Sequence, residues 1–208
     1  MARDTRQKIL DTSLAMFNEQ GQSNVTTNHI ADELDISPGN LYYHFRNKDD
    51  IIEQLFTRYE EALDAALVSP SERLPELEDI WMQLHLVFEC IWTYRFLYRD
   101  LVDILSRNRR LRLRFSRILK RSAENASGVI RGLVRAGIMR ASADEIDGTA
   151  TNILVLSTFW LNYAAARGDT DEHSAIRQGI VQVMMLLAPF LRDAERLHLN
   201  TLVQAYRP

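Results

Sequence analysis

Signals that end one helix and start another lie close together in the first fifty residues and confine this part of the chain to short helices. An apolar repeat with helical spacing ends before Gly21 and consists of Ile9, Leu10, Leu14 and Phe17. Ser37 and Pro38 then suit the N-cap and the first position of another helix. The spacing therefore predicts one helix up to Gly21, a second over about 26–34 and a third over 38–45. Three short helices, the last two joined by a tight turn, are typical of a helix-turn-helix DNA-binding motif.

The rest of the sequence also predicts helices. Asn47 suits the N-cap of a helix that runs to about Val68, and a break containing two prolines follows. Further helices are predicted over 76–92, 94–107, 108–136, 143–167 and 172 to about 198. Because the chain has only eight glycines and five prolines, and no sustained alternation of β-branched residues, we expect an all-α fold. A domain boundary near the proline-containing break separates residues 1–60 from residues 61–208.

Composition excludes several functional classes. A hydrophobic fraction of 46% in 208 residues is enough for a sizeable core, and the single cysteine, Cys90, excludes an internal disulfide. The two most apolar runs, 153–166 and 180–191, are shorter than the ~20 residues that span a bilayer. The five histidines show no metal-ligand spacing, and the sequence has no nucleotide-binding loop, nucleophile elbow or paired-carboxylate signature. We therefore expect a soluble cytoplasmic protein that is not an enzyme and has no catalytic residue, metal site, cofactor or membrane contact.

The predicted helix over 38–45 has the two faces that a recognition helix needs. Leu41 and Phe45, four residues apart, can seat the helix on its neighbours. The polar side chains that project away from them are Asn40, Tyr43 and His44, and the Tyr42 hydroxyl can reach a phosphate. Ser37 and Gly39 lie at the helix start, where backbone N–H groups attract phosphate, and the cations that follow are Arg46 and Lys48.

At these residues the chain resembles the TetR family of bacterial transcriptional regulators. The match runs through Val25-Thr26-Thr27-Asn28-His29-Ile30-Ala31, through Ile36-Ser37-Pro38-Gly39-Asn40-Leu41-Tyr42-Tyr43-His44-Phe45, and through Asn47-Lys48-Asp49. The resemblance covers about residues 6–56 and implies a homodimeric regulator, with DNA binding in residues 1–60 and effector binding and dimerisation in residues 61–208. It also implies phosphate contacts from Thr27 and Lys48. The residues that it implies would face DNA are Ser37, Gly39, Asn40, Tyr42, Tyr43 and His44.

Two residues depart from the family pattern. Members often have a base-reading basic residue at the position of Asn28, so Asn28 implies a different operator contact. His29 stands where a glutamate would complete the capping box of Thr26, which predicts a weaker cap.

Residues 1–50 also hold five basic and eight acidic side chains, a net charge of −3, so their non-specific affinity for DNA is expected to be low. This charge leaves open a helical protein-binding adaptor that has kept the fold without operator binding.

The densest charge feature lies outside the predicted motif. Residues 106–121 contain eight cations and no acid, and the segment 51–105 is acid-rich. A solvated helix start is the favoured interpretation, because blocks of charge usually lie at the surface. An anionic effector and a second phosphate-contacting patch are the alternatives, since cations at a helix N-terminus oppose its dipole.

Aromatic residues concentrate in the second half of the chain. Core packing is the first interpretation, because many of them follow helical spacing. The family resemblance adds a ligand pocket between helices, where such pockets are apolar with a few polar groups. The candidate effector-binding residues are Trp81, His85, Phe88, Trp92, Phe115, Trp160 and Tyr163.

Two apolar stripes suggest a dimer interface through residues 143–167 and 172–192. The first stripe consists of Ile146, Ala150, Ile153, Leu154, Ser157, Leu161 and Ala164, and the second of Ile176, Ile180, Val183, Met184, Leu187 and Leu191. The second helix is apolar around more than half its girth, so it must be buried on two sides, in a core or against a partner. The sequence thus predicts a repressor that binds a palindromic double-stranded operator as a homodimer and is released by a small apolar or amphipathic effector. A protein-binding adaptor and a small-molecule enzyme or carrier are the alternatives.

Overall fold

The structure is a computed structural model that describes residues 2–68, 73–169, 171–204 and 206, with no side-chain description for residues 2, 3, 172 and 173. Within these residues the regular elements are all helices, so the all-α prediction is confirmed. The only strand-like feature among them is an isolated bridge between Met139 and Leu191. None of the described helices combines the length and the apolar character needed to cross a bilayer.

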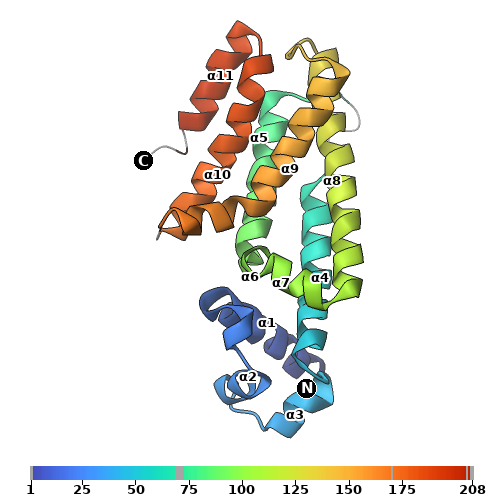
Figure 1. Cartoon of the computed structure of the whole chain (residues 1–208), viewed down its shortest axis with the longest axis vertical. Helices are drawn as coiled ribbons and strands as arrows, with labels where there is room; N and C mark the ends of the chain where they lie inside the picture. Colours follow the sequence, from blue (N-terminus) through green and yellow to red (C-terminus); the bar gives the residue numbers. More distant parts are fainter. Residues whose placement is uncertain (1, 69–72, 170, 205, 207–208) are drawn as a thin grey trace. The chain divides into compact units, whose positions relative to one another are not determined.

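The N-terminal helices begin and end where the sequence signals predict (Figure 1). Helix α1 (Ala2–Gln20) ends at Gly21, whose φ of 80° is accessible to glycine without strain. The short 3₁₀ helix η1 (Gln22–Asn24) leads to α2 (Thr27–Glu33) and then to α3 (Pro38–His44). Helix α4 (Lys48–Ala66) starts with the Asp50 N–H donating to Asn47 Oδ1 over 2.8 Å.

Two compact units divide the chain, and one segment lies in a different unit from the one that the sequence predicts. Met1–Ala62 and Tyr94–Leu113 form the first unit, and Leu63–Thr93 and Arg114–Pro208 form the second. The predicted boundary places residues 94–113 in the C-terminal domain, whereas in the structure they pack on the N-terminal helices. The Phe96 ring lies 5.3 Å from the Phe17 ring, and buried Tyr98 and Tyr59 share a 2.8 Å hydroxyl hydrogen bond.

Two of the predicted helices are each divided in the structure. The predicted helix 94–107 consists of α6 (Arg95–Arg99) and α7 (Leu101–Arg107), separated at Asp100. Asp100 has non-helical backbone angles, and its carboxylate accepts a hydrogen bond from the Gln22 N–H over 3.1 Å. The predicted helix 172–198 ends earlier, because Pro189 lacks the N–H that a continuing helix needs.

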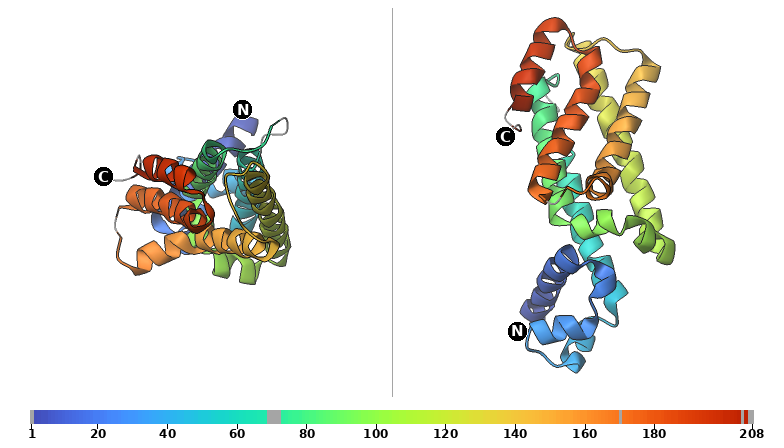
Figure 2. Two further views of the ribbon diagram at one scale, coloured as in Figure 1. Left: turned by 90° about the horizontal axis from the view of Figure 1, so that it is seen from above. Right: turned by 60° about the vertical axis from the view of Figure 1, so that its left-hand side comes forward.

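The second unit contains α5 (Leu77–Thr93), most of α8 (Arg109–Arg135), α9 (Ala143–Ala166), α10 (Glu172–Leu187), η2 (Ala188–Phe190) and α11 (Asp193–Gln204). Figure 2 shows α10 and α11 side by side in both views. The chain between them is held by backbone bonds to the segment after α8, from Arg140 N–H to Phe190 O over 2.8 Å and from Arg192 N–H to Ile138 O over 3.2 Å. Gly179 lets α10 approach the Phe88 and Trp160 rings closely.

Candidate nucleic-acid interface

The start of α2 is capped by an unusual version of the capping box. Thr26 Oγ1 accepts a hydrogen bond from the His29 N–H over 3.2 Å, and His29 Nδ1 accepts one from the Thr26 N–H over 3.4 Å. A glutamate normally supplies the second acceptor. His29 Nδ1 takes that role here, so the cap forms despite the missing glutamate.

Helix α3 presents a polar and aromatic face to solvent. Leu41 and Phe45 are buried beneath it, as predicted, and the Arg6 guanidinium lies 4.9 Å from the centre of the Phe45 ring. Tyr42 and Tyr43 are 49% and 80% exposed, which is unusual for such large side chains. Among the described residues of the first unit, no element therefore covers the predicted recognition face.

Hydrogen bonds fix the orientation of α3 relative to α2. Thr27 Oγ1 and the Tyr42 hydroxyl lie 3.1 Å apart, so the two helices are joined across the turn between them. Ser37 Oγ accepts from the Asn40 N–H over 3.2 Å and caps α3. Asn28 and Gly39 are exposed, and His44 is half-buried with its ring 5.1 Å from that of Tyr43.

Lys48 is engaged inside the unit. Its ammonium donates to Gln22 O over 2.7 Å and to Val25 O over 3.1 Å. Burial lowers the pKa of this lysine, and Arg107 lowers it further, against the opposing effect of nearby carboxylates. The position expected to touch a phosphate thus already has two protein acceptors.

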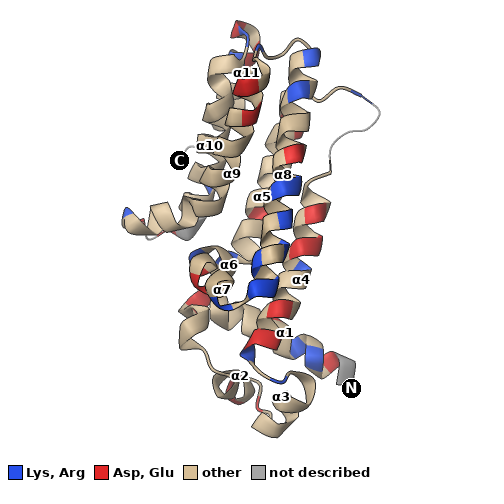
Figure 3. Ribbon diagram, turned by 45° about the vertical axis from the view of Figure 1, so that its right-hand side comes forward, with Lys and Arg blue, Asp and Glu red and all other residues tan. Residues whose placement is uncertain are grey.

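The basic run is partly balanced by carboxylates. Figure 3 shows the cations along the first half of α8 and the acidic residues of α4. Arg110 pairs with Glu53 over 3.0 Å and Arg121 with Asp64 over 2.9 Å. Within the basic run 106–121, the exposed cations that make no ion pair with the described residues are Arg109, Arg112 and Arg117.

The seven candidate effector-binding residues do not converge on one cavity of the described structure. Phe88 and Trp160 are buried together around Gly179, where Trp160 Nε1 donates to Ala175 O over 2.6 Å. A separate pair, Trp81 and His85, stacks with ring centres 6.1 Å apart. Phe115 is buried on α8, Trp92 is half-buried, and Tyr163 is 55% exposed.

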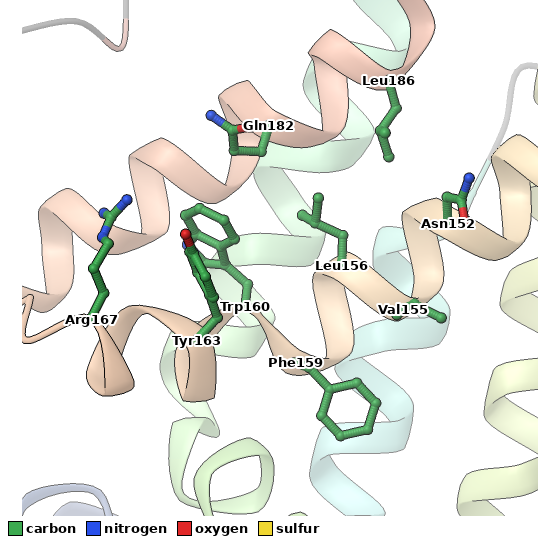
Figure 4. Close-up of a pocket in the computed structure, with 9 residues that line it drawn as sticks. All are labelled: Asn152, Val155, Leu156, Phe159, Trp160, Tyr163, Arg167, Gln182 and Leu186. Carbon is green, nitrogen blue, oxygen red and sulfur yellow. The ribbon is translucent and has the colours of Figure 1, made fainter.

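An open groove of about 540 Å³ lies on α9 and α10 (Figure 4). Trp160 and Tyr163 belong to it, with ring centres 5.4 Å apart. The lining residues that the sequence analysis missed are Asn152, Val155, Leu156, Phe159, Arg167, Gln182 and Leu186. The α9 residues of the groove recur every three or four residues, on a helix face adjacent to the predicted apolar stripe of α9. This spacing is the sequence signal that could have identified them.

The residues of the two stripes proposed as a dimer interface lie mostly on the inner faces of α9 and α10. Most of their residues are buried within the chain itself, including Ile146 and Leu161 of α9 and Val183 of α10. The exposed apolar residues of the same helices are Val155, Phe159, Tyr163 and Met185. The stripes form the inner faces of α9 and α10, because the stronger apolar face of a helix packs into its own core.

The fold and the helix-turn-helix define the class of protein, and comparisons agree with it. Residues 9–55 match the family described as "Bacterial regulatory proteins, tetR family", and residues 58–199 match "Bacterial transcriptional repressor". This chain belongs to the TetR family and is a DNA-binding transcriptional regulator.

Individual relatives cover the chain to different extents. A solved TetR-family transcriptional regulator from Marinobacter aquaeolei VT8 is 40% identical, with a TM-score of 0.90 over 98% of this chain and 99% of that one. The HTH-type transcriptional repressor KstR2 of Mycolicibacterium smegmatis is 36% identical over 80 residues, which is 35% of this chain and only 38% of that protein. The structure of a SmeT–triclosan complex shares the fold at 21% identity, with a TM-score of 0.61 over 92% of this chain and 94% of that one.

Proposed function

We propose that this chain is a repressor that binds a palindromic operator as a homodimer, with α3 of each copy in the major groove. The observation that carries the proposal is the exposed face of α3, where Tyr43 is 80% exposed although the helix is firmly seated by Leu41. An exposed tyrosine adds little to the stability of the fold, whereas in the major groove it can contact base edges. The residues proposed to face DNA are Asn28, Ser37, Gly39, Asn40, Tyr42, Tyr43 and His44.

Phosphate contacts would fix the register of α3 on the duplex. Thr27 is half-exposed beside Tyr42, and whichever of the two hydroxyls accepts in their shared hydrogen bond can donate to a phosphate. A Cβ on Gly39 would meet only Ser37 Oγ, at 3.9 Å, so packing within the chain does not require glycine there. A close approach of the DNA backbone to this position would explain why the residue is glycine.

The second copy would cover the groove on α9 and α10. Phe159 and Tyr163 are 46% and 55% exposed on α9, and Met185 is 42% exposed on α10. A contiguous exposed apolar face of this kind marks an interaction site. Two DNA-binding motifs on one dimer share the entropic cost of association, which raises the affinity for a two-fold operator.

A small apolar or amphipathic effector would release the operator by favouring dimers whose two α3 helices are wrongly spaced. The SmeT–triclosan complex shows that a protein of this fold can hold such a molecule. This part of the proposal fails if effector-bound and free dimers bind the operator equally well.

The test is selection of genomic fragments with the purified chain at about 150 mM salt, where non-specific binding is weak. We expect recovery of a shared inverted repeat, and loss of recovery with the double variant Tyr43→Ala, His44→Ala. The matched control is Met82→Ala, Leu86→Ala, two exposed residues on α5, which should recover the same repeat. Recovery of nothing from a dimer that mass spectrometry shows to be ligand-free would favour the adaptor alternative.

The dimer is tested by sedimentation of Phe159→Asp. Placing a carboxylate in the proposed interface should give a monomer, because a buried unpaired charge is costly. Leu197→Asp, at a position 69% exposed on α11, should remain a dimer. A dimeric Phe159→Asp protein would place the interface elsewhere.

A further inference from the structure

Gln22, in the turn between α1 and α2, is a buried polar residue with an unusual number of partners. It is only 5% exposed. Its backbone N–H donates to Asp100 Oδ2 over 3.1 Å, and its side-chain Nε2 donates to Asp103 Oδ2 over 3.1 Å. Its carbonyl accepts the 2.7 Å bond from Lys48. A buried polar side chain is retained without penalty only when its groups are paired in this way.

Lys48 connects this turn to two further parts of the first unit. It is the first residue of α4, and its second acceptor, Val25 O, belongs to the buried residue just before the N-cap of α2. One ammonium therefore holds both ends of the segment 22–25 against the start of α4. The charges that influence it come from Asp49 beside it and from Asp100, Asp103 and Arg107 of the segment packed against the turn.

Stability of α4 itself does not explain a cation at this position. A positive charge at a helix N-terminus opposes the helix dipole, and the favourable residues there are the following Asp49 and Asp50. The contribution of Lys48 to the stability of this unit must come from the carbonyls that it binds. Those carbonyls belong to the segment that sets where α2 begins. The hydrogen bond between Thr27 and Tyr42 joins α3 to α2, so the same segment also affects the position of α3.

We propose that Lys48 and Gln22 are positioning residues of the helix-turn-helix, and that the half-buried Lys48 ammonium acts by holding the two carbonyls that it binds. Together they fix the entry of the chain into α2 against α4 and α7. The inference rests on the proposed function only in assuming that α3 binds DNA.

The two roles of Lys48 predict different salt dependence. Each phosphate contact contributes about 0.9 to the slope of log affinity against log salt, or about two for a dimer. Loss of a phosphate contact also weakens binding to all sequences alike, whereas a misplaced α3 weakens operator binding selectively.

The experiment compares Lys48→Met with Arg46→Met, which removes an exposed cation two residues earlier. Affinity is measured on the selected operator and on an unrelated duplex between about 50 and 200 mM salt. We expect Lys48→Met to lose at least ~10-fold on the operator and less than ~3-fold on the unrelated duplex, with the slope within ~0.5 of the parent. Arg46→Met should lower the slope by about two. A similar drop for Lys48→Met, with equal losses on both duplexes, would overturn the proposal.

A second measurement needs no operator, so it separates failure of this inference from failure of the proposed function. Hydrogen exchange of backbone amides in residues 21–27 should be at least ~10-fold faster in Lys48→Met and in Gln22→Met than in Arg46→Met, because the segment loses its anchor. Exchange that is unchanged in both variants would refute the positioning role, whether or not a DNA site is found.

Discussion

Substitution of Gly179 by alanine should destabilise the protein, although alanine normally favours a helix over glycine by about 1 kcal/mol. Gly179 lies within α10, and a Cβ there would come within 2.5 Å of Phe88 Cε1 and 2.7 Å of Trp160 Cδ1. Both rings are buried, and the indole is anchored by its 2.6 Å bond to Ala175 O, so neither can easily withdraw.

The size of the effect follows from two opposing contributions. Forcing a methyl group into a packed core costs about 1–3 kcal/mol, and a Cβ at Gly179 would meet atoms of two rings at once, which favours the upper part of that range. After the gain in helix propensity, we expect a net loss of about 1–2 kcal/mol. For a chain of this size the loss lowers Tm by about 2–8 °C.

Gly128 and Gly148 provide matched controls for the same change. Both are exposed helical glycines, on α8 and α9, and a Cβ at either position meets no atom within 4 Å. Their alanine variants should gain about 0.5–1 kcal/mol. Thermal unfolding followed by circular dichroism, at one protein concentration because a dimer's Tm depends on it, compares all three. A Gly179→Ala protein as stable as the controls would refute the packing argument.

Three further substitutions test local features. Asp35 has a φ of 51°, so Asp35→Gly should relieve a left-handed residue and raise stability by about 0.5–1 kcal/mol; a lower Tm would contradict this. Ser142→Ala removes the cap of α9, where Ser142 Oγ accepts from the Glu145 N–H over 3.3 Å, and should cost about 1 kcal/mol in urea unfolding. Hydrogen bonds from Arg73 lower the pKa of Asp79, so its stabilising contribution is present above the ordinary aspartate pKa of about 4 and is lost as pH falls through the lower folded value. The stability difference between the parent and Asp79→Asn should therefore shrink on acidification from pH 6 to pH 2, and a constant difference would argue against it.

The helix-turn-helix could be predicted because the signals that start and end its helices are local in the sequence. Gly21, Ser37 and Asn47 each satisfy backbone groups at a helix end within a few residues, so the chain needs no tertiary information to place these boundaries. The buried side of α3 followed equally well from the spacing of Leu41 and Phe45.

Tertiary contacts decide the features that the sequence did not reveal. The position of α6 and α7 depends on Phe96 meeting Phe17 and on Asp100 and Asp103 meeting Gln22, which are about eighty residues apart in the chain. Periodicity identified an apolar face on α9, but it could not tell a face buried in the chain from one available to a partner. For the same reason periodicity could not tell whether an aromatic residue such as Phe88, Phe115 or Trp160, each of which is buried, packs in the core or lines a pocket.

The central claim is that two copies of α3 read one operator together, and insertion of base pairs between the operator half-sites tests it most directly. Five extra base pairs rotate one half-site by about half a helical turn, onto the opposite face of the duplex. Binding by a rigid dimer should then fall by at least ~100-fold, and ten extra base pairs should restore part of it. Affinity that does not change with the five-base-pair insertion would contradict the account.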